Sequence, residues 1–443
     1  MVLVEELQRA RWFSGKSRAI REALVVDRAA WVTGAEVCLV EVRYEVGPPE
    51  TYVLAEGLEH PAIARALLDG FRRPPVPSQA GGRVVFTPGR WFLDLARETT
   101  EPIALMRGEQ SNTSIRFGDA VILKLFRRLQ FGPNPDVEVG YFLTEHTRFR
   151  ATPAVLGSID YVSSEGVTAS LALLQRFERN RGDAWTTTRH RLTAILDGGG
   201  DTEASIEAMA RLGRTTADLH VALANGSGDF AAEPIQDSDV AEWRQAILDE
   251  VYAAGGALTR RSIDLDTPSL VRRADGIAGL TGAYKTRHHG DYHLGQVLER
   301  DDGSFVIIDF EGEPSKPLAQ RRERRSPLRD VAGMLRSLDY ARNAALRAGD
   351  PADQQRIRRA RVWHTRVREA FLGKYLEAVR REAPMLLPRD AQPALAALEL
   401  EKAAYEVLYE LNNRPDWLPI PLAALQPSAT LPAMADQSNE CRR

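Results

Sequence analysis

Cysteine is almost absent from this chain of 443 residues, which contains only Cys38 and Cys441. Two cysteines cannot supply a disulfide framework or a four-ligand zinc site, so we expect a reducing, cytoplasmic location. No apolar run approaches the roughly 18 residues that a membrane helix needs, and residues 1–18 lack the apolar centre of a secretory signal. The sequence therefore predicts a protein with no membrane partner.

A strong charge of one sign is also missing, because 58 basic residues stand against 61 acidic ones. The formal net charge of -3 is too weak to attract nucleic acid, so no nucleic-acid partner is expected. The hydrophobic fraction of 44% and the charged fraction of 27% are ordinary for globular proteins. The length exceeds the roughly 250 to 300 residues at which single cores stop growing, which predicts at least two domains.

The pattern of apolar residues changes along the chain and indicates three parts. Residues 1–90 contain two alternating stretches, at residues 29–54 and 83–86, around a short helix at residues 60–72, which predicts a small α+β domain. Residues 91–178 contain several strand-like runs and one helix at residues 135–147, a pattern typical of an antiparallel sheet that carries a helix. Residues 179–443 show long helical periods, with one short strand-rich section at residues 284–311.

The most specific motif is HGDYHLGQ at residues 289–296, followed by VIIDFE at residues 306–311. Phosphoryl transfer needs a carboxylate that accepts the proton of the attacking hydroxyl, and further oxygen ligands that hold magnesium. In the kinase order, Asp291 is the catalytic base, and Gln296 and Asp309 are the metal ligands, although Gln296 stands where asparagine is usual. Either segment alone could be a chance match, but the ordered pair predicts ATP and Mg²⁺ as cofactors.

Residues upstream of this motif complete a nucleotide site. Lys124 lies in the apolar run at residues 120–126, where a buried ammonium is costly unless it meets an anion such as the phosphates of ATP. Glu138 lies near the start of the helix that follows the residues NPD at 134–136, and it is placed to pair with Lys124. A solvated acid in the first helical turn explains Glu138 equally well.

Two further segments are assigned to nucleotide binding. One is a polar hairpin whose amides and hydroxyls could cover phosphates, although it is not a glycine-rich loop. Its residues are Gln110, Ser111, Asn112, Thr113 and Ser114. The other contains Gln175 and Phe177, at the end of the last apolar strand before the helical half, where a kinase hinge would meet adenine. An ordinary interdomain connector explains this second segment nearly as well.

Together, these residues make the chain resemble the bacterial maltokinases, whose fold is protein-kinase-like and aminoglycoside-phosphotransferase-like. The resemblance covers almost the full length, and its most specific segments include RWFSGKSR from Arg11, NPDVE from Asn134, HGDYHLGQVL from His289, DFEGEP from Asp309 and YEVLYELNNRPDWLPIPL from Tyr405. It implies an α+β, kinase-like bilobal fold. A small cap domain would span residues 1–90, an antiparallel-sheet N-lobe residues 91–178, and a mainly helical C-lobe with the catalytic loop and sugar site residues 179–443.

A cluster of aromatic, acidic and basic residues near the C-terminus is the candidate sugar site. Carboxylates and arginine hydrogen-bond to hydroxyls, and aromatic rings stack on the apolar faces of sugars. A tyrosine-rich core stripe with solvated acids is the alternative interpretation. The residues assigned to the substrate are His289, Tyr405, Glu406, Tyr409, Glu410, Arg414 and Trp417.

The resemblance implies ATP-dependent phosphorylation of maltose to α-maltose 1-phosphate, feeding glycogen or α-glucan biosynthesis, with a trehalose/maltose isomerase as an associated partner to be tested. Two alternatives stay open. One is a kinase of the same fold that acts on another sugar, such as glucosamine. The other is a catalytically silent nucleotide-binding module that regulates a partner. Asp291 argues against this second alternative, because a silent relative needs no base.

For the segment RWFSGKSR, packing is the simplest interpretation, and a regulatory or lobe-docking role is the alternative.

Overall fold

The computed structural model describes residues 2–97, 101–106 and 112–426, and the chain forms two compact units. The first unit comprises Met1–Asp183, His289–Asp291 and Gln296–Glu323, and the second comprises Ala184–His288, Tyr292–Gly295 and Arg324–Arg443. The chain therefore passes back and forth between the units around the predicted catalytic loop. The division into three domains at residues 90 and 178 stays a prediction.

The first unit contains most of the strands. In chain order its helices and strands are α1 (Val2–Arg9), β1 (Ile20–Val32), β2 (Ala35–Tyr44), β3 (Glu50–Ala55), α2 (Pro61–Gly70), β4 (Val76–Pro77), β5 (Arg83–Pro88), β6 (Ile103–Leu105), β7 (Asn112–Phe117), β8 (Val121–Phe126), β9 (Arg128–Leu129), α3 (Pro135–His146), β10 (Val155–Val162), β11 (Thr168–Arg176), β14 (Val297–Glu299), β15 (Phe305–Ile307) and α8 (Leu318–Arg321).

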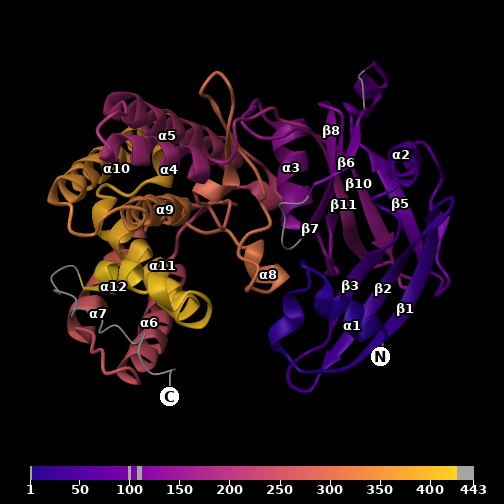
Figure 1. Ribbon diagram of the computed structural model, residues 1–443, viewed down its shortest axis with the longest axis horizontal. Coiled ribbons are helices and arrows are strands. Elements are labelled where there is room, and N and C mark those ends of the chain that lie inside the picture. The colour runs from indigo at the N-terminus through magenta and orange to yellow at the C-terminus, as the bar shows by residue number, and fades with distance from the viewer. Residues whose placement is uncertain (1, 98–100, 107–111, 427–443) are drawn as a thin grey trace. The chain divides into compact units, whose positions relative to one another are not determined.

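Two antiparallel sheets form the framework of this unit. One has the strand order β1-β2-β3-β9, and the other has the order β4-β5-β10-β11-β8-β7-β6. Figure 1 labels most of these strands. Apolar side chains from both sheets share one core, which includes Trp31 and Val53 of the four-stranded sheet and Ile115, Leu123 and Leu125 of the seven-stranded sheet. Helix α3 packs against β10. The sheets therefore fix the strands that carry the predicted nucleotide residues.

Strand β1 begins earlier than the sequence pattern indicates. The alternation of apolar and polar residues predicted strands only from residue 29, whereas β1 already starts at Ile20. Leu24 and Val25 are consecutive and both exposed, and the register of β1 against β2 shifts just after Val25. Such irregularities interrupt the period of two on which the prediction depended.

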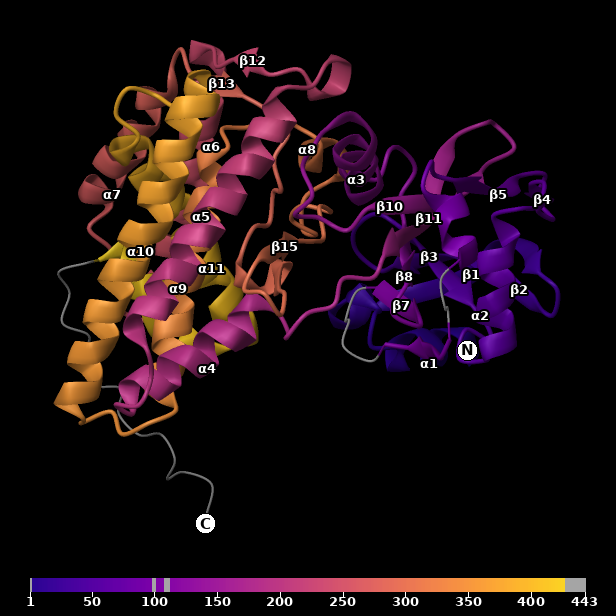
Figure 2. The ribbon, with the colours of Figure 1, turned by 90° about the horizontal axis from the view of Figure 1, so that it is seen from above.

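The second unit is mainly helical. In chain order its helices and strands are α4 (Ala184–Leu196), α5 (Thr202–Ala224), β12 (Glu233–Pro234), α6 (Asp237–Thr259), α7 (Thr267–Asp275), β13 (Tyr284–Lys285), α9 (Leu328–Arg347), α10 (Gln354–Glu382), α11 (Gln392–Asn413) and α12 (Pro419–Leu425). Helix α10 packs along α5, and α11 packs against α6 and α9 (Figure 2). Buried positions of α11 recur every three or four residues, as at Leu400, Ala403 and Val407.

These elements confirm the prediction of an α+β protein in which a sheet-containing part precedes a helical part. Among the residues that the structure describes, no helix is both long enough and apolar enough to cross a membrane.

Candidate active site

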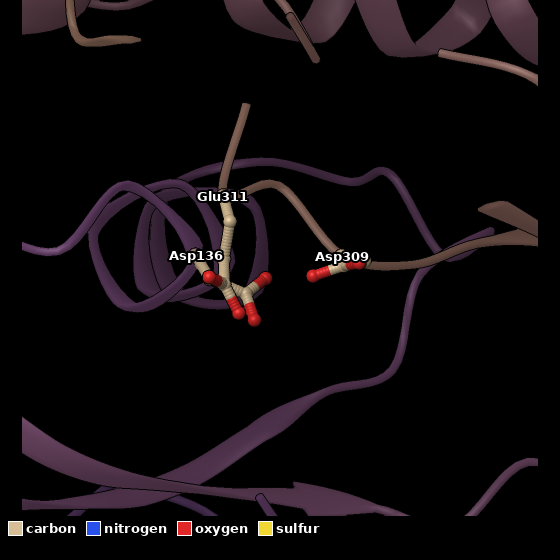
Figure 3. A group of neighbouring side chains, drawn as sticks. All are labelled: Asp136, Asp309 and Glu311. Carbon is tan, nitrogen blue, oxygen red and sulfur yellow. The ribbon is translucent and has the colours of Figure 1, made fainter. Parts of the chain in front are cut away.

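Lys124 of β8 is the centre of the candidate active site. Its ammonium lies 2.9 Å from a carboxylate oxygen of Asp136, 2.6 Å from one of Asp309 and 2.7 Å from one of Glu311. Figure 3 shows these three carboxylates, from the start of α3 and from the segment that follows β15, close to one another. Only 8% of Lys124 is exposed, so the three acids balance a charge that burial would otherwise penalise.

Asp136 is the α3 acid that pairs with Lys124, and the prediction that Glu138 would do so is wrong. Helix α3 starts directly after Asn134, whose side chain accepts a hydrogen bond from the amide of Asp136 across 2.9 Å. Residues two apart on a helix point about 200° apart, so only one of these acids can face β8. Asp136 is buried and faces Lys124, whereas Glu138 accepts two hydrogen bonds from Arg322, at 2.8 and 3.0 Å.

The charges of this cluster shift the pKa values of its members. Burial lowers the pKa of Lys124, but the three carboxylates outweigh it and hold the pKa well above its usual range. Burial raises the pKa of Asp309, but the Lys124 ammonium outweighs that effect and holds the pKa below its usual value. Burial raises the pKa of Glu311 despite the nearby ammonium, and the charges of Asp309 and Asp136 add to the increase. Three acidic side chains therefore face one ammonium, and acids outnumber bases in this cluster.

The donor set of this cluster fits a magnesium ion. Carboxylate oxygens of Asp136, Asp309 and Glu311 lie within 4.8 Å of one another. The side-chain amide of Gln296 donates a hydrogen bond to Asp309 across 3.0 Å, which places a further oxygen-bearing side chain beside them. Mg²⁺ prefers such hard oxygen ligands, and a cluster in which acids outnumber bases favours a cation. Asp309, Gln296 and Glu311 would hold the ion. The metal roles of Gln296 and Asp309 stay predictions, and the geometry favours them.

The backbone of Asp309 is strained. Its φ of 68° lies in the left-handed region, which residues with a side chain seldom adopt. Hydrogen bonds hold this turn on both sides, because the amide of Ile308 donates to the carbonyl of Gln296 across 3.0 Å and the amide of Phe310 donates to Asp136 across 2.9 Å. Strain of this kind persists where the surrounding structure enforces it, and it is common at functional sites.

Asp291 is half-buried in the loop before β14. It follows Gly290, whose φ of 86° favours glycine. His289 is only 1% exposed, its Nε2 hydrogen-bonds to the carbonyl of Ile308 across 2.9 Å, and its ring centroid lies 5.0 Å from that of Phe310. His289 therefore connects the predicted catalytic loop to the segment after β15, and the prediction that it contacts the substrate is wrong, because its ring is enclosed. The role of Asp291 as base stays a prediction.

Strand β7 carries two of the predicted phosphate-binding residues on the face of Lys124. Asn112 donates a hydrogen bond to Glu311 across 2.7 Å. Ser114 is buried and lies opposite Lys124 in the pairing of β7 with β8. Both side chains thus face the lysine cluster, which consists of Lys124, Asp136, Asp309 and Glu311. Their contact with phosphates stays a prediction.

Thr113 points to the other face of the sheet, because successive side chains of a strand alternate. Its hydroxyl accepts a hydrogen bond from Nε of Arg127 across 2.8 Å. The prediction that the side chain of Thr113 covers phosphates is therefore wrong. Gln110 and Ser111, the other two residues of the predicted hairpin, lie outside the described residues.

The end of β11 contains the two residues assigned to adenine binding. Gln175 lies opposite Ile122 of β8, and the amide of Phe177 donates to the carbonyl of Ala120 across 2.9 Å. The guanidinium carbon of Arg116 lies 4.1 Å from the centroid of the Phe177 ring. These contacts fix Gln175 and Phe177 beside β8, and their role in adenine binding stays a prediction.

The second unit contains the residues predicted for the sugar, and two of its acids are buried in a network of charges. Glu406 accepts hydrogen bonds from Nε and from a terminal nitrogen of Arg336, at 3.0 and 2.7 Å. Arg336 also donates to Asp339 across 2.6 Å. Burial lowers the pKa of Arg336, but the carboxylates of Glu406 and Asp339 outweigh it and raise that pKa. Glu406 is therefore engaged by a permanent cation.

Glu410 supports an aromatic stack. It accepts a hydrogen bond from the hydroxyl of Tyr340 across 3.0 Å and another from Arg414 across 2.7 Å. Trp417 stacks on Tyr340, with ring centroids 6.1 Å apart and an angle of 12° between the ring planes. Arg414 is exposed and Trp417 is half-buried, so an aromatic ring and a hydrogen-bond donor are both accessible. Such a pair can stack on a sugar and bind its hydroxyls.

Tyr409 is 44% exposed and stacks on Tyr405, with ring centroids 6.5 Å apart. The helix α11 thus gathers most of the predicted acceptor residues in one unit. Their contact with a substrate stays a prediction for Tyr405, Glu406, Tyr409, Glu410, Arg414 and Trp417.

Several members of the two clusters were not predicted. Two of them adjoin predicted residues, because Asp136 belongs to the NPD motif and Glu311 follows Asp309 by two positions. The other three are Arg336, Asp339 and Tyr340, which share one face of α9 at intervals of three and four residues. The spacing predicts that these three residues share a face, but it does not indicate that Arg336 and Tyr340 meet Glu406 and Glu410, which lie 70 positions further along the chain.

Comparison with known proteins finds no family model that matches the chain. A glucosamine kinase of Mycolicibacterium smegmatis is 28% identical over 381 residues, which cover 85% of this chain and 88% of the relative. A glucosamine kinase of Streptacidiphilus jiangxiensis is 26% identical over 344 residues, which cover 76% of each chain. These relatives are named for glucosamine, whereas the sequence motifs suggested a maltokinase.

A solved structure of a glucosamine kinase in complex with glucosamine, ADP and inorganic phosphate resembles this chain with a TM-score of 0.69 and 21% sequence identity. The match covers 91% of this chain and 93% of the solved chain. A second glucosamine kinase structure gives the same TM-score of 0.69 and covers 96% of this chain. The chain therefore has the kinase-like fold that the motifs predicted.

Proposed function

We propose that the chain is an ATP-dependent kinase that transfers a phosphoryl group to a hydroxyl of a sugar. The observation that carries this proposal is the buried ammonium of Lys124, held among the carboxylates of Asp136, Asp309 and Glu311. Kinases bind the phosphates of ATP with a strand lysine and magnesium-binding acids. The loop that bears Asp291 hydrogen-bonds to the same segment through His289, which supports a base next to this cluster.

In the proposed reaction, the acceptor hydroxyl oxygen attacks the γ-phosphorus of ATP and forms a new phosphorus–oxygen bond. The bond from the γ-phosphorus to the β,γ-bridging oxygen breaks, and ADP leaves with that electron pair. Asp291 accepts the proton of the hydroxyl, and Lys124 orients the phosphate oxygens. Magnesium, when bound, supplies charge neutralisation for the phosphates. Most of the rate enhancement then comes from positioning and electrostatics, because the protein forms no covalent intermediate.

Glucosamine is the first candidate acceptor. Two relatives that align with most of the chain are glucosamine kinases. In the second unit, the stack of Trp417 on Tyr340 and the exposed Arg414 are suited to the ring and the hydroxyls of a hexose. An amino sugar therefore ranks above the maltose that the sequence motifs suggested.

Maltose, with α-maltose 1-phosphate as product, is the second candidate acceptor. The guanidinium carbon of Arg414 lies 5.4 Å from the ring centroid of Tyr409 and 5.0 Å from that of Trp417, so the aromatic surface continues past a single ring. A second sugar ring would use this additional surface. The expected role in glycogen or α-glucan biosynthesis and the association with a trehalose/maltose isomerase depend on maltose, and none of the comparisons named above mentions either.

A panel of sugars tests the proposal. Purified protein would be incubated with ATP, Mg²⁺ and glucosamine, N-acetylglucosamine, glucose or maltose, with ADP release followed by a coupled assay and the phosphorylated position identified by NMR. Faster turnover of glucosamine than of maltose supports the ranking, and the opposite order reverses it. ATP binding in calorimetry without ADP release for any sugar would contradict the kinase and favour a silent regulatory module. Asp291→Asn controls for contaminating kinases.

A further inference from the structure

Arg127 lies at the junction between the two sheets of the first unit. It lies three residues after Lys124, between β8 and β9. Strand β8 belongs to the seven-stranded sheet and β9 to the four-stranded sheet. The amide of Val53 donates to its carbonyl across 2.8 Å, and its guanidinium donates to the carbonyl of Val53 across 3.1 Å. Its Nε donates to Thr113 across 2.8 Å. Arg127 thus connects β3 with β7.

The guanidinium of Arg127 is a buried cation. The residue is 7% exposed, and burial lowers its pKa to about 10. Within the described parts of the chain, no carboxylate forms an ion pair with it, and the ring of Trp12 covers it instead, with the centroid 4.9 Å from the guanidinium carbon. Burying a cation without an acid is costly, and a tryptophan face offsets only part of that cost. The guanidinium of Arg127 does what a neutral side chain could not, namely donate hydrogen bonds to both Val53 and Thr113.

Trp12 belongs to the N-terminal segment RWFSGKSR, which the proposed reaction does not use. Contacts with β3 fix this segment. The ring centroid of Phe13 lies 4.9 Å from that of Tyr52, and the hydroxyls of Ser14 and Tyr52 hydrogen-bond across 2.8 Å. Trp12 is therefore held in place over Arg127 by its own neighbours.

Thr113 transmits this support to the opposite face of β7. Its neighbours on the strand are Asn112, which donates to Glu311 across 2.7 Å, and Ser114, which lies opposite Lys124. Because Thr113 shares its backbone with these two residues, a shift of Thr113 moves them as well. A hydrogen bond to Thr113 from the far face therefore fixes residues that face the lysine cluster.

We infer that Arg127 is a positioning residue for nucleotide binding and that Trp12 holds it in place, so that the N-terminal segment sets the affinity for ATP. This inference rests on the proposed function. Loss of Trp12, or of the hydroxyl of Thr113, loosens β7 beside Glu311. The affinity for nucleotide falls as a result, while the affinity for the sugar is unchanged.

The test compares full-length Trp12→Ala, Arg127→Lys and Thr113→Val with wild type. Binding of ADP with Mg²⁺ is measured by titration calorimetry, and KM is measured for ATP and for the sugar. We expect the Kd for ADP and the KM for ATP to rise about fivefold, as for the loss of one hydrogen bond, with the KM for the sugar unchanged. Arg43→Ala is the matched control, because Arg43 lies on the same four-stranded sheet but pairs with Glu22 and Glu41 on its exposed surface.

If these residues only stabilise the fold, the three variants will have a lower melting temperature and an unchanged Kd for ADP. That result would overturn the inference. Equal increases in both KM values would overturn it too. If Trp12→Ala fails to fold, Thr113→Val carries the test, because it removes only the accepting hydroxyl. Wild-type protein that binds ADP but phosphorylates no sugar contradicts the proposed function. Active Trp12 and Thr113 variants with wild-type nucleotide affinity contradict only this inference.

Discussion

Lys124 and Asp309 are 185 positions apart in the sequence, yet the ammonium of one lies 2.6 Å from a carboxylate oxygen of the other. Each keeps its partner charged, because the pKa of the lysine is raised and that of the aspartate is lowered. Asp309 also accepts a hydrogen bond from Gln296, so the same carboxylate faces the proposed phosphate ligand and the proposed metal ligand. Phosphate binding and metal binding are therefore expected to depend on each other.

Asp291→Asn should lower kcat by about a thousandfold, because the acceptor hydroxyl loses its base. The Kd for ADP should stay close to that of wild type, since the amide keeps the size of the side chain and the lysine cluster is intact. Initial rates and titration calorimetry measure the two effects separately. Wild-type turnover in this variant would remove Asp291 from the mechanism.

Asp136→Asn and Glu138→Gln form a matched pair. The first removes a charge that Lys124 contacts at 2.9 Å, so kcat/KM for ATP should fall about a hundredfold through misplacement of the lysine. The second changes a residue that pairs with Arg322, and its kcat/KM should stay within about twofold of wild type. Steady-state kinetics at varied ATP concentration compare them. If kcat/KM for ATP fell further in Glu138→Gln than in Asp136→Asn, Glu138 would be the functional partner of Lys124, as the kinase pattern suggested.

His288 should make the protein less stable as the pH falls. Burial lowers its pKa from 6.5 to about 3; the nearby Asp330 opposes this shift, and Arg329 adds to it. Between these values the unfolded chain binds a proton that the folded protein does not, so the free energy of unfolding falls with decreasing pH, by up to about 1.4 kcal/mol per pH unit. Melting temperatures at pH 7.5, 6.5 and 5.5 measure the slope.

His288→Asn is the control for this pH dependence, because it cannot take up a proton in this range. Its melting temperature should vary less with pH than that of wild type, whatever its absolute stability. An identical slope in both proteins would assign the pH dependence to other groups.

Glu406→Ala should cost about 3 kcal/mol of the free energy of unfolding, because it leaves Arg336 buried with only Asp339 as its partner. Urea unfolding monitored by circular dichroism gives the value. Lys374→Ala is a suitable control, since Lys374 pairs with Glu377 on an exposed surface and such pairs contribute about 0 to 1 kcal/mol. Equal stability of the Glu406 and Lys374 variants would show that the buried network contributes little.

Trp417→Ala should raise the KM for the sugar about tenfold, because a stacking face next to Tyr340 is lost. The Kd for ADP should not change, since Trp417 and the lysine cluster belong to different units. Kinetics with the best sugar of the panel and calorimetry with ADP distinguish the two effects. A changed Kd for ADP with an unchanged KM for the sugar would move Trp417 out of the acceptor site.

The parts of the site that are local in sequence could be predicted. Gln296 and Asp309 occur within one short stretch and are in contact, and Lys124, which stood out as a charge inside an apolar strand, contacts Asp309. The role of Asp291, which the same stretch suggests, stays a prediction. The sheet-then-helix order was equally visible, because the hydrophobic period changes from two to nearly four along the chain.

The directions in which side chains point were harder to predict from the sequence than the order of the motifs. Whether Asp136 or Glu138 faces β8 depends on how α3 packs, and both are acids in the first turn of the helix. Thr113 is different, because once Lys124 is placed on the nucleotide face, the pairing of β7 with β8 would turn Thr113 away from it. Pairs such as Arg336 with Glu406, 70 positions apart, leave no periodic signal in either helix.

The positive φ of Asp309 limits which residues evolution or a mutant library can place there. Glycine adopts this conformation without strain, and aspartate and asparagine adopt it at a smaller cost than other residues, whereas a β-branched residue would have to change the backbone of the turn. An inactive Asp309→Val enzyme would thus confound a lost carboxylate with a refolded loop. Asparagine is the replacement that separates the effect of the charge from the effect of the backbone conformation.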